Sequence, residues 1–245
     1  RRRAKKLAEE KRQVRFQFIS VLVHELKAPL AAIEGYLQIM DNHVLGDYID
    51  GYDQVIDRSK IRLDGMRKLI IDILDMTRIE SGEKRREFSK VDVVELAKAA
   101  METALPEAEM RDISIHFDDS RPLTMYADRS EIEIILNNLV TNAVKYNRDG
   151  GSVTITLTSE DGVYTFKVSD TGIGMTKEDT AKLFNEFVRI KNDKTRNILG
   201  SGLGLSTTKK LALLYNGDVA VESEPDVGST FTVMLREPAE ETIRI

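Results

Sequence analysis

The sequence predicts two domains of different fold class: a helical hairpin, then an α+β domain with helices stacked on one face of a sheet. Up to about residue 82, apolar residues recur at spacings of three and four, the period of a helix that packs against other helices. From about residue 92, such segments are mixed with segments in which apolar and polar residues alternate, as in half-buried strands. We therefore expect a hairpin at 1–83, a linker at 84–91, a second domain at 92–237 and a tail at 238–245.

The composition narrows the classes of function. Hydrophobic residues make up 41% of the 245 residues and charged residues 31%, enough to form a core, and the net charge of −5 argues against a nucleic-acid partner. The absence of cysteine excludes disulfides, thiol catalysis and cysteine-based zinc sites, and it suits a reducing compartment. No apolar run approaches the roughly 20 residues of a membrane helix, so we expect a cytoplasmic fragment.

The chain begins with the basic stretch RRRAKKLAEEKRQVR, and we expect a fragment of a longer protein; the family resemblance given below implies that the missing upstream part includes a sensory domain. Such a stretch can flank a membrane span, in which case the full-length protein is membrane-anchored. The alternative is an ordinary solvated helix face.

The first helix has a wider apolar face than a two-stranded coiled coil needs. Phe16 and Ile19 lie beside a seam formed by Ala4, Leu7, Val14, Phe18 and Val21. This width favours a four-helix bundle, with residues 1–15 as an upstream coiled-coil linker. The inward positions expected on the second helix are Val55, Ile56, Leu63, Met66, Leu69, Ile70, Ile73 and Leu74. Because two helices alone bury too little apolar surface, we expect a homodimer.

Glycine and Asp/Asn residues at 41–51 predict the connection between these helices, and Gly82 is expected to end the second one. In the second domain we expect helices at 91–110, 130–147, 177–187 and about 203–214, and mostly antiparallel strands at 113–117, 152–158, 163–170, 217–224 and 229–236. Ser130 and Glu133 have capping-box spacing, so we expect the second of these helices to begin at Ser130.

Four polar residues form a stripe on the helix at 130–147. Asn138, Asn142, Lys145 and Tyr146 place two carboxamides, an ammonium and a phenol on one side of the helix. A polar stripe is most often only the solvated side of a helix. Asparagine is a poor helix former, however, so the two asparagines favour a binding site.

Two glycine-bearing loops add to this stripe. In SDTGIGM, Asp170 precedes Gly172 and Gly174, and its carboxylate can accept a hydrogen bond from an exocyclic amine such as that of adenine. The same Asp-Thr-Gly also occurs in ordinary turns. In NILGSGLGLS, three alternating glycines precede a helix and can present backbone N–H groups to a phosphate, with a flexible hinge as the alternative.

Together these motifs resemble those of the sensor histidine kinases. NNLVTNAVKYN, DTGIGM, LFNEFVRI and GSGLGLS are similar to that family's nucleotide-binding boxes, and VHELKAPL is similar to its phosphoacceptor box. The resemblance covers about residues 14–236. It implies a dimeric four-helix bundle, an α/β-sandwich of the Bergerat type that binds ATP and Mg²⁺, and transfer of phosphate from a histidine to the receiver domain of a response regulator.

The resemblance also implies roles for individual residues. Asn142 is expected to ligate Mg²⁺, Asp170 to bind adenine with support from Ser229, and Arg189 to reach the γ-phosphate. The other expected nucleotide contacts are Asn138, Lys145, Tyr146, Gly172, Gly174, Gly200, Gly202, Gly204 and Leu205. Phe184 and Phe187 are expected to anchor a lid at residues 188–201.

His24 is the expected nucleophile, and Glu25 beside it is the expected general base. A neutral imidazole can attack the γ-phosphorus if its other nitrogen loses a proton, and a neighbouring carboxylate can accept that proton. A zinc-protease interpretation fails because HELKA has no second histidine four residues on. Pro29 is expected to kink the helix below His24, whereas His43 and His116 are interpreted as structural.

Two other functions remain to be weighed: an ATP-binding scaffold without catalysis, and an ATPase of the same nucleotide fold. ATP-hydrolysing relatives carry a glutamate four residues before the magnesium asparagine, where this chain has Asn138, which is no base. We also expect weak phosphatase activity toward the partner. Ala28 stands where many members of the family have Thr or Asn to position a water molecule.

Overall fold

The structure is a computed structural model that describes residues 2–46, 48–81, 86–118, 121–190, 192, 195, 198 and 200–237. Its contacts separate two compact units. The helical unit contains Arg1–Ile73 and Leu199–Ser201, and the α/β unit contains Leu74–Ile198 and Gly202–Ile245. The domain boundary expected at 84–91 stays a prediction. Residues from Leu74 belong to the α/β unit, where the Met76 side chain is completely buried.

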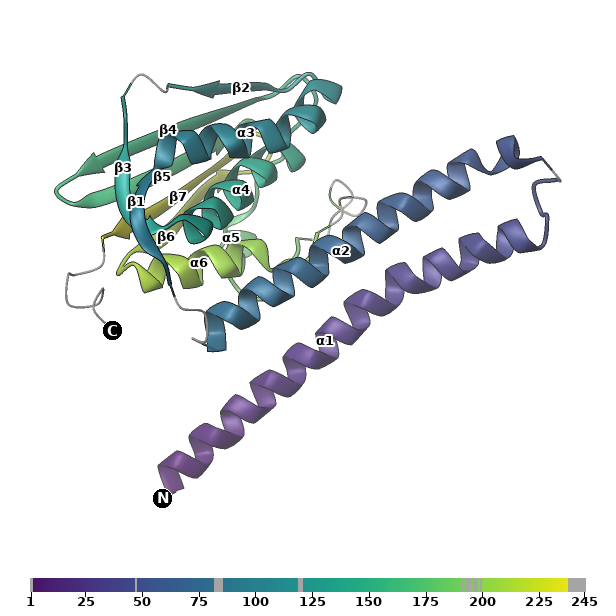
Figure 1. The fold of residues 1–245 in the computed structure, drawn as a ribbon, viewed down its shortest axis with the longest axis horizontal. Helices are drawn as coiled ribbons and strands as arrows, with labels where there is room; N and C mark the ends of the chain where they lie inside the picture. The colour runs from purple at the N-terminus through teal and green to yellow at the C-terminus, as the bar shows by residue number, and fades with distance from the viewer. Residues whose placement is uncertain are drawn as a thin grey trace. The chain divides into compact units, whose positions relative to one another are not determined.

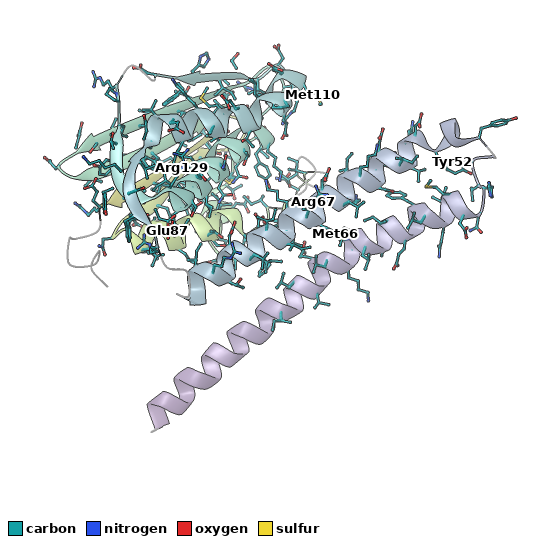
Figure 2. The ribbon with its side chains drawn as sticks, in the orientation of Figure 1. Tyr52, Met66, Arg67, Glu87, Met110 and Arg129 are labelled. Carbon is teal, nitrogen blue, oxygen red and sulfur yellow. The ribbon has the colours of Figure 1, made fainter. Side chains whose placement is uncertain are left out.

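Two long helices form the predicted hairpin (Figure 1). They are α1 (Arg2–Asp41) and α2 (Asp53–Ser81), and η1 (Ile49–Tyr52) directly precedes α2. Tyr52 lies at the connection (Figure 2), where its hydroxyl donates a hydrogen bond to the Gly46 carbonyl at 2.7 Å and accepts one from the Leu45 N–H at 3.2 Å. The connection expected at 41–51 is therefore confirmed, with a buried tyrosine closing it.

Only part of the predicted inward face of α2 is buried within one chain. Val55 and Leu69 are buried, whereas Leu63 and Ile70 are 51% and 46% exposed. Other large apolar side chains exposed on the hairpin include Val23, Leu30, Leu37, Ile61 and Ile71. The described part of the hairpin thus leaves many large apolar side chains exposed within one chain.

The α/β unit contains a five-stranded sheet of order β2-β4-β5-β7-β6. Its strands are β2 (Ser114–Phe117), β4 (Ser152–Glu160), β5 (Val163–Asp170), β6 (Asp218–Glu224) and β7 (Gly228–Arg236). β2 and β4 are parallel, and the other pairs are antiparallel. Asp161 and Gly162 both have positive φ in the β4–β5 turn, as the two-residue hairpin expected there requires.

Three helices cover one face of this sheet: α3 (Val93–Met110), α4 (Arg129–Lys145) and α6 (Gly204–Leu214) (Figure 1). Alternate residues of the strands point into the core, as Val153 and Ile155 of β4 and Phe166 and Val168 of β5 show. α4 is the central helix of this layer, and its buried face consists of Ile132, Ile135, Leu136, Leu139, Val140, Ala143 and Val144. The predicted α+β layer is therefore confirmed.

Three expectations were wrong in detail. The N-cap of α4 is Asp128, whose carboxylate accepts from the N–H groups of Ser130 and Glu131, so Ser130 does not begin the helix. α5 (Lys177–Thr180) is a single turn instead of a helix at 177–187. The range expected as linker includes most of β1 (Phe88–Asp92), which pairs with β3 (Thr124–Asp128), and neither strand was expected.

In the described parts of the chain, no helix is both long enough and apolar enough to cross a membrane. Gly82, expected to end α2, and the expected tail at 238–245 lie outside the described residues.

Candidate functional site

The first turn of α6 is tied to α4 by Asn138. Its Nδ2 donates to the Gly204 carbonyl at 3.0 Å, and the Thr208 hydroxyl donates to the same oxygen at 2.9 Å. A Cβ on Gly204 would lie 2.9 Å from the Asn138 Oδ1, so the glycine permits this close approach. The Asn138 amide is therefore engaged with the glycine-rich helix start.

Asn142, one turn further along α4, has a partly exposed carboxamide. No described residue forms a hydrogen bond with this side chain. Among the described residues there is also no group of three His, Cys, Asp or Glu that could hold a metal ion.

Lys145 and Tyr146 close the stripe at the end of α4. The Lys145 ammonium lies 5.5 Å from the centre of the Tyr146 ring. Burial raises the pKa of the Tyr146 phenol, and the positive charge of Arg189 opposes that rise. Arg189 itself donates to the Ile198 carbonyl at 2.5 Å. The structure thus brings the Arg189 charge into the electrostatic environment of Tyr146.

Asp170 lies at the end of β5 with one carboxylate oxygen fixed. Its Oδ1 accepts from the Gly172 N–H at 2.8 Å and from the Ser229 N–H at 3.3 Å. Among the described residues, none hydrogen-bonds Oδ2, which leaves that oxygen for a ligand donor. Burial raises the pKa of Asp170 to about 6 despite these two hydrogen bonds. Ser229 contacts Asp170 through its backbone, while its hydroxyl lies 3.0 Å from that of Ser223.

Gly172 and Gly174 let the loop after β5 pack closely on its neighbours. A Cβ on Gly172 would collide with the Tyr146 carbonyl, and one on Gly174, where φ is 61°, would collide with the Glu224 carbonyl. The Ile173 N–H donates to the same Tyr146 carbonyl at 3.1 Å. The Asp170 loop and the end of α4 are thereby joined.

The glycine-rich segment is only partly described. Gly202 has a φ of 72°, and a Cβ there would lie 2.9 Å from the Phe187 backbone. Leu205 is partly buried against the core. Gly200 groups with the helical unit, whereas Gly202 and Gly204 belong to the α/β unit. Residues 191, 193–194, 196–197 and 199 of the expected lid lie outside the described residues.

Sequence reasoning missed two polar residues behind the site. Asn147 is buried, and its Nδ2 donates to the carbonyls of Ala143 and Ser152 at 3.1 and 3.0 Å. Thr171 accepts from the Ser152 N–H at 2.8 Å through its hydroxyl. An asparagine directly after a helix is a known capping signal, but nothing in the sequence pairs it with β4.

His24 and Glu25 lie in α1, five and four residues before Pro29. The His24 side chain lies outside the described residues, and the Glu25 side chain is partly exposed. Both belong to the helical unit, whereas the stripe on α4 and the loop after β5 belong to the α/β unit.

Two family models match the chain, one over each of its two parts. Residues 14–82 match the His Kinase A (phospho-acceptor) domain, and residues 127–239 match the histidine kinase-, DNA gyrase B- and HSP90-like ATPase domain. The chain belongs to the sensor histidine kinase family.

The chain also resembles curated proteins, one of which is named as a sensor histidine kinase. The chain is 33% identical over 239 residues to a non-motile and phage-resistance protein of Caulobacter vibrioides, and 30% identical over 233 residues to the sensor histidine kinase RcsC of Escherichia coli. These matches cover 94% and 93% of this chain but only 28% and 24% of the relatives. The chain thus spans about a quarter of their length.

A solved structure, full-length ShkA in complex with AMPPNP, matches this chain with a TM-score of 0.64 and 27% identity. The match covers 91% of this chain and 47% of ShkA.

Proposed function

We propose that the chain is a homodimeric protein histidine kinase that transfers the γ-phosphoryl group of ATP to His24 and then to an aspartate of a response regulator. The observation that carries this proposal is the joint presence of the phosphoacceptor match over residues 14–82, which include His24, and the ATPase match over 127–239. ShkA, whose structure holds an ATP analogue, supports the choice of nucleotide.

The adenine would meet Asp170, whose Oδ2 can accept a hydrogen bond from the exocyclic amine. Tyr146 would lie near the sugar and base, and Lys145 and Arg189 would supply positive charge to the phosphates. The backbone N–H groups around Gly202 and Gly204 would hold phosphate oxygens at the positive end of α6. Asn142 would give Mg²⁺ one oxygen ligand, and the bound ion would neutralise phosphate charge.

In the proposed reaction, a ring nitrogen of neutral His24 attacks the γ-phosphorus. The bond between that phosphorus and the β–γ bridging oxygen breaks, and ADP leaves with the bonding electrons. The proton on the other ring nitrogen passes to the Glu25 carboxylate. In the second step, an aspartate carboxylate of the response regulator attacks the phosphorus, the bond between phosphorus and the ring nitrogen breaks, and the other ring nitrogen takes back the proton from Glu25, so that neutral imidazole leaves.

Asn138 argues against an ATPase as the main activity. Its carboxamide cannot accept a proton from water, and its amide is held on the Gly204 carbonyl at 3.0 Å. Water attack on the γ-phosphate therefore lacks a base at this position.

Incubation with γ-labelled ATP and Mg²⁺ tests the proposal. Wild type and His116→Ala should carry label, because His116 lies in β2 and has an exposed side chain. His24→Ala should carry none, and Asn142→Ala should carry little. Steady ATP turnover by His24→Ala at the wild-type rate would instead support an ATPase, and binding of ATP without any label would support a non-catalytic scaffold.

A second variant tests the phosphatase expectation. Ala28 has no side chain that can hold a water molecule, so the phosphorylated response regulator should lose phosphate slowly in the presence of wild type and ADP. Ala28→Thr should accelerate the loss. Rapid dephosphorylation by the wild type would show that the expectation is wrong.

A further inference from the structure

Arg111 is absent from the set of site residues predicted from the sequence, yet it binds the end of the helix that carries them. It follows Met110, the last residue of α3 (Figure 2). Its guanidinium donates to three carbonyl oxygens at the end of α4, those of Val144 (2.9 Å), Lys145 (3.2 Å) and Asn147 (2.6 Å). Its Nε donates to Asp149 Oδ1 at 2.8 Å.

The helix end that Arg111 binds also supports the Asp170 loop. The Tyr146 carbonyl, between two of the acceptors, accepts from the Ile173 N–H at 3.1 Å. Gly172 lies against the same carbonyl so closely that no side chain fits there. Any shift of the backbone at 145–147 would therefore move both Tyr146 and the loop after Asp170.

The chemistry of this contact suits arginine better than lysine. The last carbonyls of a helix lack partners within the helix and carry partial negative charge. A planar guanidinium can donate to several of them at once in a fixed geometry, whereas an ammonium is a mobile point charge. The Arg111 side chain is only 25% exposed, so water competes weakly for these bonds.

We propose that Arg111 is a positioning residue for nucleotide binding, which acts by fixing the backbone from Lys145 to Asn147 and, through it, the Asp170 loop. The inference rests on the proposed function. Arg111 does not touch the nucleotide in this account, so its loss weakens the affinity for ATP and leaves the rate of phosphoryl transfer at saturating ATP nearly unchanged.

The test compares variants of the whole chain by equilibrium binding of ATP and by initial labelling rates. Arg111→Met and Arg111→Lys should each raise the Kd for ATP about tenfold, equivalent to about 1.4 kcal/mol. The labelling rate at saturating ATP should change less than about twofold, because the reacting atoms are untouched. Asp149→Asn, which removes only an 80% exposed partner, should raise the Kd by about twofold or less.

Arg129→Met is the matched control. Arg129 lies at the opposite end of α4 (Figure 2) and forms exposed ion pairs with Glu95 and Glu133 at 2.8 and 2.9 Å. The Arg129→Met change removes one arginine and two exposed ion pairs, but Arg129 does not contact residues 145–147. The Kd for ATP should therefore stay at the wild-type value.

A purely structural role would give a different result. Partial unfolding raises an apparent Kd by the inverse of the folded fraction, so a tenfold rise would need a protein that is about 90% unfolded. A tenfold rise in a variant that circular dichroism shows to be folded therefore reports positioning. If Arg111→Met does not fold, Arg111→Lys gives the decisive value. A wild-type Kd in either folded variant would overturn the inference.

The two proposals can fail separately. If wild type binds ATP but His24 takes no label, the kinase proposal fails and the series of Kd values still decides the role of Arg111. If wild type does not bind ATP, both proposals are overturned.

Discussion

Asp170, the carboxylate proposed to bind adenine, lies in an environment that disfavours its charged form. Burial raises its pKa from 3.8 to about 6, although two backbone N–H groups hydrogen-bond its Oδ1. A change of this size favours the protonated form in the folded protein by roughly 3 kcal/mol. A carboxylate held in this way has a cost in stability, and it can be explained by the ligand donor that its Oδ2 is placed to accept.

The affinity for ATP should therefore depend on pH. Protonation of Asp170 removes a charged acceptor, so wild type should lose affinity as the pH falls through about 6. The Asp170→Asn variant cannot titrate, and the ratio of the two affinities cancels the titration of ATP itself. That ratio should fall about tenfold between pH 8 and pH 5. A constant ratio would show that the carboxylate charge does not contribute to binding.

The same group makes a prediction about stability. Because the folded pKa exceeds the unfolded one, the protonated carboxyl stabilises the fold below pH 3.8, and this contribution is lost as the pH rises through about 6. Asp170→Asn should thus melt at a higher temperature than wild type at pH 8, and the difference should disappear near pH 4. Equal melting temperatures at both pH values would contradict the assigned burial cost.

Residues beyond the familiar motifs were hard to find from sequence. Asp170, Gly172 and Asn138 stand out by spacing and composition. Arg111 and Asn147 do not, because their partners are backbone carbonyls brought near by the fold. The support of Asp170 by Ser229 also comes from a backbone N–H, which any residue except proline could supply.

At the scale of elements, a buried polar cluster joins the start of α4 to β1 and α6. Glu131, with a side chain only 4% exposed, accepts from Arg86 at 2.7 Å and from the Tyr215 hydroxyl at 2.6 Å. The Tyr215 hydroxyl also accepts from the Asp128 N–H at 3.0 Å. Burial, together with the charge of Glu131, raises the pKa of Tyr215. The cluster thus fixes the N-terminal end of the helix that carries the site.

Removing one charge of this cluster should lower the free energy of unfolding more than removing both charges. Arg86→Met leaves a buried carboxylate without its cation and should lower the free energy of unfolding by about 3–5 kcal/mol. Arg86→Met combined with Glu131→Gln should cost clearly less than the sum of the two single changes. Urea unfolding of the four proteins in a double-mutant cycle measures the coupling, and additive costs would refute a direct ion pair.

Elements with a long, regular apolar pattern were predicted correctly from the sequence. Short elements whose structure depends on contacts with other parts of the chain were predicted poorly. The alternation in β4 and β5 located that hairpin, including its turn at Asp161 and Gly162. β1 and β3 have five residues each and no regular alternation of buried and exposed side chains, so they were missed. α5 stops at Thr180 although the apolar pattern continues, because the segment then turns, with Phe187 at a φ of 59°, while Leu183 packs into the core.

At the scale of the whole molecule, the apolar face of α2 is only partly covered among the described residues of one chain. Leu63 is 51% exposed, and Ile70, two turns further along the same side of α2, is 46% exposed. Burying a leucine side chain contributes about 1.5–3 kcal/mol, and in a symmetric dimer each position counts twice. In the proposed homodimer, the hairpin of a second chain would cover this apolar face.

A charge on this face should dissociate the dimer. Sedimentation of Leu63→Glu is expected to give the mass of one chain, whereas wild type gives the mass of two. Leu105→Glu serves as the control, because Leu105 is 44% exposed on α3 in the other unit and should leave the dimer intact. A dimeric Leu63→Glu would place the interface elsewhere.

The chemical stability of the label tests the central claim most directly, namely that the γ-phosphoryl group of ATP is transferred to an imidazole nitrogen of His24. After incubation with γ-labelled ATP and Mg²⁺, the labelled chain is split between acid and alkali. A phosphoramidate should lose its label in acid and retain it in alkali. Label that survives acid and is released by alkali would contradict the account.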